Sequence, residues 1–306
     1  MPRLTPSQLS SNDLLADRRA DYAEMLFSSG DHAAAAELMT GALELAPNWA
    51  MGWYRLGEMQ EAAGSLDAAT VAWRTSLRLD PADRAGATLK LQLIGAAPVG
   101  DTPPSAFVEA LFDQYADKFD QALVETLHYR VPILLATAIA ATGRTEFDHA
   151  VDLGCGTGLM GMKLRPVAQR LDGYDISAEM LRKARDKGVY DRLVKADLQE
   201  LEPEGEAADL VTAADVFMYL GALDRVFSSV MKMLAPGGVF AFSVERFSGE
   251  GAFELQESRR YAHSEAYVHG LIAAAGLKLV SLERAVIRQD RREPVVGLIV
   301  VTERPV

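Results

Sequence analysis

Cysteine, excess positive charge and long apolar runs are all scarce in this chain of 306 residues. Cys155 is the only cysteine, which excludes a disulfide and any metal or iron–sulfur site built from several cysteines. The formal net charge is −12 at pH 7, and no stretch concentrates Lys and Arg beside aromatic residues as a nucleic-acid surface would. Residues 1–13 lack the apolar core of a signal peptide, and no run approaches the roughly 20 apolar residues that span a bilayer. We therefore expect a cytoplasmic globular protein that binds neither nucleic acid nor membrane.

A glycine-rich turn after a short apolar strand is the most informative local feature. Residues 149–158 read His-Ala-Val-Asp-Leu-Gly-Cys-Gly-Thr-Gly. Glycine permits positive φ and a close approach of the backbone to a ligand, and we expect Thr157 to cap a helix that begins at Leu159. The dinucleotide-binding pattern would need its third glycine at position 159, which is leucine. The turn therefore indicates a cofactor site, and it does not favour NAD.

Acidic residues end the next two predicted strands in turn. Asp175 follows the apolar segment 170–174 and lies 23 residues after Asp152, which leaves room for one helix between the strands. A carboxylate at the tip of the second strand is where a doubly wound fold binds ribose hydroxyls. Asp197 ends a third apolar segment, where it could accept a hydrogen bond from an adenine amino group. NAD sites do not need this acid, so the pattern favours S-adenosylmethionine.

Four ordered motifs resemble those of the class I S-adenosylmethionine-dependent methyltransferases. They are Val151–Gly158, Tyr174–Leu181, Ala196–Leu198 and Leu234–Gly238, and the resemblance covers roughly residues 105–306. It implies S-adenosyl-L-methionine as cofactor and S-adenosyl-L-homocysteine as product. The single cysteine excludes the three-cysteine cluster of radical S-adenosylmethionine enzymes, so the implied transfer is polar.

The resemblance assigns cofactor contacts to particular residues. Gly154 and Gly156 approach the methionine part, while Asp197 with Leu198 reads the adenine edge. We interpret Cys155 as a small loop residue rather than a reactive thiol. Ile176 and Met180 flank the adenine, and the helical spacing of Met180, Leu181 and Ala184 also predicts that Met180 faces the core. The complete cofactor set is Tyr115, Tyr129, Asp152, Gly154, Cys155, Gly156, Asp175, Ile176, Met180, Ala196, Asp197, Leu198 and Ala214.

Tyr115 and Tyr129 enter this set through a second resemblance. The segment Tyr115–Asp120, followed by Tyr129–Pro132, is similar to the entry helices of bacterial methyltransferases that carry an N-terminal helical-repeat region. In such proteins a tyrosine at one of these positions would close over the cofactor.

Alternating apolar runs and helices predict an α/β fold of the Rossmann-like, doubly wound type with a mostly parallel, seven-stranded sheet. Two C-terminal strands are expected to pair as an antiparallel edge. In a fold of this kind the ligand lies at the carboxyl ends of the first three strands. The predicted strands are 149–153, 170–175, 192–196, 208–213, 238–244, 278–283 and 295–301.

The first hundred residues have a different pattern, which repeats at an interval of 34 residues. This resembles the tetratricopeptide repeat, a pair of antiparallel helices, and a helix over 84–93 would cap two such units. We expect a repeat domain over 1–95, a linker over 96–104 and the methyltransferase domain over 105–306. The repeats would bind a protein partner, mediate homo-oligomerisation or act as a scaffold. Matching positions are Gly30 and Gly64, Ala35 and Ala69, Leu43 and Leu77, Leu45 and Leu79, and Pro47 and Pro81.

His263 is the candidate general base. It lies in Arg259–Ser264, between the fifth strand and the next helix, and its ordinary pKa near 6.5 suits proton removal. Similar repeat-bearing methyltransferases have a comparable Arg-Tyr-x-His-Ser stretch. The structural alternative is that His263 and Ser264 cap the helix that starts at Glu265. We also place Tyr261 among the substrate-binding residues.

Polar residues after the fourth and fifth strands complete the candidate acceptor site. Asp215 and Tyr219 would orient the acceptor, although Asp215 could equally cap a helix. Glu245 and Arg246 are expected to face the same cleft and bind a polar acceptor, although a salt bridge between surface loops would look the same in sequence. Asp215 has no acidic pair downstream, so no metal is expected. His32, His128, His149 and His269 are interpreted as structural.

These features predict methyl transfer to oxygen or nitrogen of a small-molecule acceptor. The first alternative is a protein methyltransferase that recruits its substrate through the repeats. The second is a non-catalytic scaffold that binds S-adenosylmethionine. No residue pattern identifies the acceptor, because folds of this kind change substrate through their loops.

Overall fold

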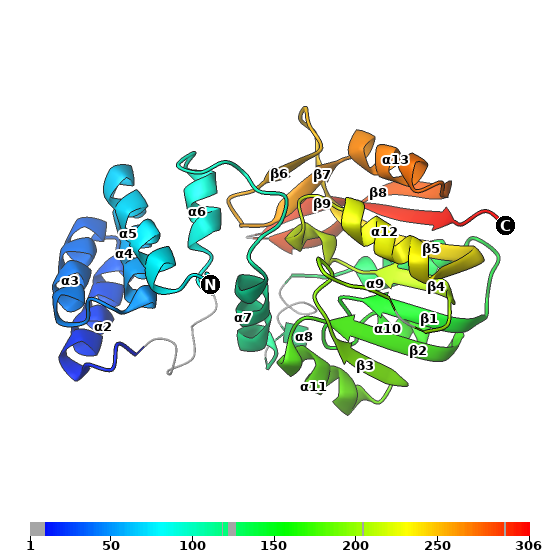
Figure 1. The fold of residues 1–306 in the computed structure, drawn as a ribbon, viewed down its shortest axis with the longest axis horizontal. Helices are drawn as coiled ribbons and strands as arrows, with labels where there is room; N and C mark the ends of the chain where they lie inside the picture. Colours follow the sequence, from blue (N-terminus) through cyan, green and yellow to red (C-terminus); the bar gives the residue numbers. More distant parts are fainter. Residues whose placement is uncertain (1–9, 118, 122–126, 204, 291) are drawn as a thin grey trace. The chain divides into compact units, whose positions relative to one another are not determined.

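The chain divides into two compact units, residues 1–110 and residues 111–306 (Figure 1). The computed structural model describes residues 10–306 except 118, 122–126, 204 and 291, so the predictions for residues 1–9 and for Lys118 lie outside the described residues. The boundary falls within α7 (Ser105–Tyr115) instead of the expected linker 96–104. Phe107 explains the difference, because its ring packs over Gly86, 2.7 Å from where a Cβ would stand. The start of α7 is thereby packed into the first unit.

Helices in pairs build the first unit. The pair α2 (Leu14–Ser28) and α3 (His32–Leu45) is followed by α4 (Ala50–Ala62) and α5 (Leu66–Leu79), and then by α6 (Ala87–Leu93). Helices α3 and α5 begin at residues 32 and 66 and end at 45 and 79, so both boundaries repeat after 34 residues. Gly57 allows α4 to approach α5, because a Cβ there would overlap the indole of the fully buried Trp73.

A mostly parallel sheet forms the centre of the second unit (Figure 1). Strands β3, β2, β1, β4 and β5 lie side by side in that order and pair in parallel, and β9 pairs antiparallel with both β5 and β8. The Rossmann-like prediction and the antiparallel edge are therefore confirmed. The strands are β1 (Phe147–Leu153), β2 (Ala168–Asp175), β3 (Arg192–Lys195), β4 (Ala208–Ala213), β5 (Leu234–Phe247), β8 (Lys278–Asp290) and β9 (Glu293–Glu303).

The predicted count of seven strands is wrong, because the sheet has nine. The additional strands are β6 (Phe253–Leu255) and β7 (Tyr261–Ser264), which are too short to show a clear alternation in the sequence. Glu245 of β5 pairs with Gly297 of β9 and with Ala262 of β7. Since a strand has two edges, β7 must lie on the edge that β4 occupies as far as Phe242. Strand β7 therefore continues the sheet beyond the carboxyl end of β4.

Apolar side chains cover both faces of this sheet. One face packs against α12 (Asp224–Met233) and α13 (Glu265–Ala274), and the other against α9 (Val131–Ala140) and α10 (Gly161–Leu164). Helix α11 (Ala178–Lys187) joins β2 to β3. No helix within the described residues is both long and apolar enough to cross a membrane.

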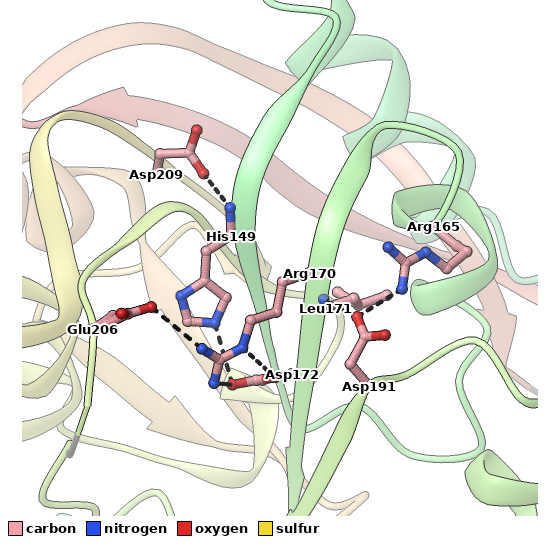
Figure 2. Close-up of polar contacts among 8 residues, drawn as sticks. All are labelled: His149, Arg165, Arg170, Leu171, Asp172, Asp191, Glu206 and Asp209. Carbon is pink, nitrogen blue, oxygen red and sulfur yellow. Dashed lines mark hydrogen bonds and ion pairs between the residues drawn. The ribbon is translucent and has the colours of Figure 1, made fainter.

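Polar contacts fix the amino-terminal halves of β1 and β2 (Figure 2). His149 Nε2 lies 3.2 Å from the carboxylate of Asp172, and Arg170 donates to the same carboxylate at 2.8 Å. The backbone N–H of His149 donates to Asp209 at 3.0 Å, and that of Leu171 to Asp191 at 2.7 Å. His149 is thus structural, and these contacts lie away from the carboxyl ends where the predicted site begins.

Candidate functional site

Backbone hydrogen bonds bring the three predicted strand ends together. The N–H of Cys155, just past β1, donates to the carbonyl of Tyr174 in β2 at 2.9 Å, and the N–H of Ala196, just past β3, donates to the carbonyl of Asp175 at 2.9 Å. Because β3, β2 and β1 are neighbours, their acidic and glycine-rich ends form one edge of the sheet. The separate sequence motifs therefore converge on one place.

The glycine loop adopts the predicted backbone conformation. Gly154, Gly156 and Gly158 have φ values of +65°, +52° and +93°. A Cβ at Gly154 would overlap Val216, whereas the nearest atom to a Cβ at Gly156 belongs to Phe119, at 3.8 Å. Gly156 is therefore the glycine of this loop with space for a ligand against its backbone.

Two smaller predictions about the loop have different outcomes. Thr157 does not cap a helix, because α10 begins at Gly161 and the Thr157 hydroxyl is bonded to Asp120 and to Lys187. Cys155 is buried, and this burial, together with the nearby acids, raises the pKa of its thiol well above the ordinary range. The thiol stays protonated, as expected of a loop residue without nucleophilic function.

Asp175 holds the loop against the end of β2. Its carboxylate accepts hydrogen bonds from the N–H of Gly156 and the N–H of Ser177, each at 2.8 Å. Burial raises the pKa of Asp175 to about 6 despite these bonds, and the nearby Asp113 adds to the rise. A carboxylate can accept about four hydrogen bonds, so Asp175 retains capacity for ribose hydroxyls.

Asp152 is fully buried at the end of β1. Its carboxylate accepts from the hydroxyl of Tyr190 at 2.7 Å and from that of Thr212 at 2.9 Å. Burial raises its pKa to about 6, and the charge of Asp175 adds to the effect. Among the described residues, neither Asp152 nor Asp175 forms an ion pair. Two neighbouring carboxylates thus lie in a buried site without a compensating cation.

The predicted adenine-binding residues surround the ends of β2 and β3. Ile176 and Asp197 are partly exposed, and Asp197 accepts a hydrogen bond from the N–H of Gln199 at 2.8 Å. Leu198 is buried and belongs to the same hydrophobic core as Tyr174. Met180 has no exposed surface, which confirms that it faces the core; an adenine contact for it stays a prediction.

The two tyrosines expected to close over the cofactor differ in their surroundings. Tyr115 is the last residue of α7 and is partly exposed. Tyr129 packs on the core, and its desolvation, with the negative charges of Asp215 and Asp152, raises the pKa of its hydroxyl. Tyr129 therefore lies near Asp152 as well as near Asp215 and Arg288. Ala214, just past β4, is partly buried against the same core.

A buried ionic network occupies the carboxyl ends of β4 and β5. Arg288 of β8 donates through Nη1 to both oxygens of Asp215, at 2.9 and 3.0 Å, and through Nη2 to Glu245. All three side chains are almost entirely buried. Asp215 has a φ of +56°, and its N–H donates to the hydroxyl of Ser243 at 2.9 Å. Among the described helices the next one, Phe217–Tyr219, has Val216 and not Asp215 at its N-cap, so the capping alternative for Asp215 is wrong.

Arg260 extends this network towards the surface. It lies 3.6 Å from Glu245 and 2.6 Å from Asp290, so two guanidinium groups neutralise most of the charge of three carboxylates. Tyr219 lies beside these groups and packs edge to face against Phe112, with 4.9 Å between ring centroids. Burial raises the pKa of Tyr219 to about 12, so its hydroxyl remains a donor at neutral pH.

The structure argues against His263 as a general base. Its ring is fully buried, Nε2 lies 2.9 Å from the carbonyl of Gly221, and burial lowers its pKa to about 4. A neutral imidazole that donates to a carbonyl is a structural group without access to an acceptor. Ser264, by contrast, caps α13 as the alternative predicted, since its hydroxyl accepts from the N–H of Tyr267 at 3.2 Å.

Glu245 and Arg246 do not share a cleft. Both belong to β5, where successive side chains point to opposite faces of the sheet. Glu245 binds Arg288, whereas Arg246 pairs in register with His263 and donates to Ser248 at 2.9 Å. Tyr261 is also fully buried, packed against Phe253 with ring centroids 5.7 Å apart. Among the predicted substrate-binding residues Glu245, Arg246, Tyr261 and His263, Glu245 is the one that binds Arg288.

Sequence reasoning missed Arg288 and Tyr190. Arg288 follows Asp215 by 73 residues, and nothing near it in the sequence marks it as a partner. Tyr190 is packed among three glycines: a Cβ at Gly161 would overlap it, and a Cβ at Gly158 or Gly173 would lie 3.0 or 2.9 Å from its ring. Gly161 and Gly173 lie outside any turn motif in the sequence, so they could have indicated that a large side chain packs against the backbone there.

Comparison with known proteins agrees with this geometry. A family model described as a methyltransferase domain matches residues 151–242, which run from β1 into β5 and include the glycine loop, Asp175 and Asp215. These residues are therefore similar to a methyltransferase domain. The open backbone at Gly156, and the carboxylates of Asp152 and Asp175, which form no ion pair among the described residues, fit a cofactor such as S-adenosylmethionine.

Curated relatives match part of this chain. Trans-aconitate 2-methyltransferase of Paracidovorax citrulli is 33% identical over 138 residues, which are 44% of this chain and 48% of that protein. A malonyl-[acyl-carrier protein] O-methyltransferase of Geobacter sulfurreducens is 36% identical over 123 residues, or 38% and 45% of the two chains. This chain thus spans about half the length of the curated relatives it matches.

A solved structure shows the same fold. The 1,6-didemethyltoxoflavin-N1-methyltransferase of Burkholderia thailandensis, determined with S-adenosylhomocysteine bound, superposes with a TM-score of 0.53 at 19% identity. The match covers 69% of this chain and 93% of that one. At this level of identity the likeness concerns the fold alone. In the part of the chain that the structure describes, no group of three or more His, Cys, Asp or Glu side chains could hold a metal ion.

Proposed function

We propose that this protein transfers the methyl group of S-adenosylmethionine to oxygen or nitrogen of a small-molecule acceptor. The observation that carries the proposal is the pair of buried carboxylates, Asp152 and Asp175, which have no cationic partner among the described residues. Burying charge without a partner is costly, so such a site favours a ligand that brings positive charge. S-adenosylmethionine carries an ammonium and a sulfonium group, whereas the diphosphate of NAD would add negative charge.

Individual roles follow from the positions of the side chains. In the proposal, Asp175 binds the ribose hydroxyls, Asp197 the adenine edge, and the backbone at Gly156 lies along the methionine part. The cofactor supplies an activated methyl group when bound, and its thioether leaving group needs no acid. The protein contributes mainly position, since a nucleophile held in line at about 3 to 3.5 Å from the reacting carbon gains most of the rate.

Asp215 and Tyr219 are the proposed orienting groups for the acceptor. Both follow β4, next to the glycine loop, as the packing of Val216 on Gly154 shows. Arg288 holds the carboxylate of Asp215 in place, and Tyr219 presents a protonated hydroxyl. The names of the curated relatives support a small or carrier-bound acceptor, since they act on trans-aconitate and on malonyl-[acyl-carrier protein].

A protein acceptor is the second candidate, and one observation favours it. The helices of the first unit repeat after 34 residues, and we propose that they are tetratricopeptide repeats. Repeats of this kind present extended binding surfaces to other proteins. In that case the first unit would recruit the protein that is methylated.

One labelling experiment separates these functions. The full chain is incubated with S-adenosylmethionine radiolabelled in the methyl group, together with either a low-mass metabolite extract or a dialysed protein extract of a bacterium. The proposal predicts label in the low-mass fraction, dependent on the enzyme and lost in Asp175→Ala. Label in the protein fraction that hydroxylamine does not release would establish the second candidate, because hydroxylamine cleaves the thioester of a carrier-bound acceptor. Cofactor binding without transfer to either fraction would favour the non-catalytic scaffold.

A further inference from the structure

Lys187 lies at the meeting point of the glycine loop and the segment that covers it. Its Nζ is 2.6 Å from Oδ2 of Asp120 and 3.1 Å from the hydroxyl of Thr157, and Thr157 also donates to Oδ1 of Asp120. Its aliphatic chain passes Gly158, 3.7 Å from where a Cβ would stand. The three polar groups therefore close a ring of contacts in which each touches both others.

Asp120 links this ring to the open side of the loop. It belongs to the short helix α8 (Phe119–Gln121), and the neighbouring Phe119 is the nearest side chain to the free face of Gly156. Phe119 in turn packs edge to face on Phe112, with centroids 6.1 Å apart, and Phe112 packs on Tyr219. Fixing Asp120 thus fixes the aromatic side chain that lies over the backbone where the cofactor is expected.

A second ion pair, between Lys183 and Asp117, is more exposed to solvent than the pair between Lys187 and Asp120. Lys183 of α11 lies 2.8 Å from Asp117, but the Asp117 side chain is 79% exposed, against 42% for Asp120. Among the described residues, Asp117 pairs only with side chains of α11, whereas Asp120 also reaches Thr157 within the loop. Exposed pairs contribute little because solvent screens them, so Lys183 provides a matched control one helical turn away.

We propose that Lys187 is a positioning residue of the cofactor site, which retains bound S-adenosylmethionine by fixing Thr157 and Asp120 and thereby Phe119 over Gly156. This inference rests on the proposed function, because it presupposes that the cofactor binds along the glycine loop. Lys187 need not touch the cofactor. Lys187 lowers the rate at which S-adenosylmethionine dissociates, and it affects the association rate less.

The test measures release of the cofactor from the full chain. Protein loaded with methyl-tritiated S-adenosylmethionine is chased with excess S-adenosylhomocysteine, and retained label is followed by filter binding. Lys187→Met and Asp120→Asn are each expected to speed release by about tenfold, with a smaller change in association, as is usual when a retaining contact is lost. The double variant should release no faster than either single variant, because the two residues act in one ring. Lys187→Arg should retain slow release.

Controls make every outcome informative. Lys183→Met should release like the wild type, and circular dichroism checks that each variant is folded; Asp120→Asn tests the ring from its other side if Lys187→Met does not fold. Wild-type release should quicken with salt, and release from Lys187→Met should not. Unchanged release in both single variants, additive effects, or equal loss in Lys183→Met would overturn the inference. Failure of the wild type to retain any label would overturn the proposed function itself.

Discussion

The two ends of the candidate site differ in whether a cation accompanies their buried carboxylates. At the cofactor end, Asp152 and Asp175 share a buried site in which the described residues supply hydrogen-bond donors but no cation. At the acceptor end, Asp215 and Glu245 are buried to a similar degree but share Arg288, and Arg260 adds a second cation. In the proposed function a cationic ligand completes the first end, whereas described side chains already supply the cations at the second. The difference suggests two uses of buried acids: Asp152 and Asp175 are available to bind a ligand, whereas Asp215 and Glu245 are held in the structure by Arg288.

Arg288→Met should have the largest effect, and it should fall on stability. The substitution leaves Asp215 and Glu245 buried without their shared cation, so the free energy of unfolding should drop by about 3 to 5 kcal/mol. Affinity for S-adenosylmethionine, measured on the folded fraction, should change little. Urea denaturation provides the measurement, and Arg284→Met is the control because the Arg284–Glu265 pair lies at the surface of the same strand. A large loss of cofactor affinity with unchanged stability would mean that the Arg288 network binds the cofactor and does not stabilise the fold.

Asp175→Asn should show the opposite pattern. Removing the charge and one acceptor should weaken S-adenosylmethionine binding by about 100-fold, or about 2.7 kcal/mol. Stability without ligand should change by about 1 kcal/mol or less, because a buried unpaired charge is lost together with a hydrogen bond. Calorimetry gives the affinity. Asp191→Asn is the matched control, since Asp191 also accepts from a backbone N–H, at 2.7 Å, but is exposed and paired with Arg165.

The pH dependence of binding sharpens the contrast further. The pKa values of Asp152 and Asp175 are both raised to about 6, so these groups are mostly neutral at pH 5 and ionised at pH 7.5. Their raised pKa values favour the folded protein at low pH, and this contribution is lost as the pH rises through 6. The affinity for S-adenosylmethionine should move the other way and increase by about tenfold from pH 5 to pH 7.5. A flat affinity profile would contradict the assignment of an uncompensated anionic site.

Tyr190→Phe should produce the smallest change in cofactor affinity. The ring still fills the space beside Gly158 and Gly173, but Asp152 loses the donor that stabilises its ionised form. The pKa of Asp152 should rise above about 6, which shifts the affinity profile to higher pH, and stability should fall by about 1 to 2 kcal/mol. Calorimetric titrations across pH measure the shift. Tyr22→Phe, on an exposed helix face, should leave the profile unchanged.

Local motifs allowed the cofactor end to be predicted from sequence. Gly154, Gly156 and Asp175 lie directly at strand ends, and parallel strands of a doubly wound sheet place those ends at one edge, so spacing alone brings them together. The acceptor end could not be predicted in this way. Its organising residue, Arg288, comes from the antiparallel edge, and whether Glu245 or Arg246 faces it depends on the register of β5, which flips with a shift of one residue.

His263 and the strand count failed for a related reason. The stretch Arg259–Ser264 is predicted to carry substrate-binding groups, but most of it forms β7, which pairs with β5 and β6, and both Tyr261 and His263 are buried. Strands of three or four residues have too few positions to show a period of two. Thr157 was misjudged because its partners, Asp120 and Lys187, lie 37 and 30 residues away.

The most direct test of the account asks whether Asp152 and Asp175 form an anionic site for the cofactor. The full chain is titrated calorimetrically with S-adenosylmethionine and with NAD, at pH 6 in two buffers of different ionisation enthalpy. The account predicts that S-adenosylmethionine binds, that binding releases protons as Asp152 and Asp175 ionise, and that NAD gives no signal. Binding of NAD, or binding of S-adenosylmethionine without proton release, would show that these acids do not form an anionic site for a cationic cofactor.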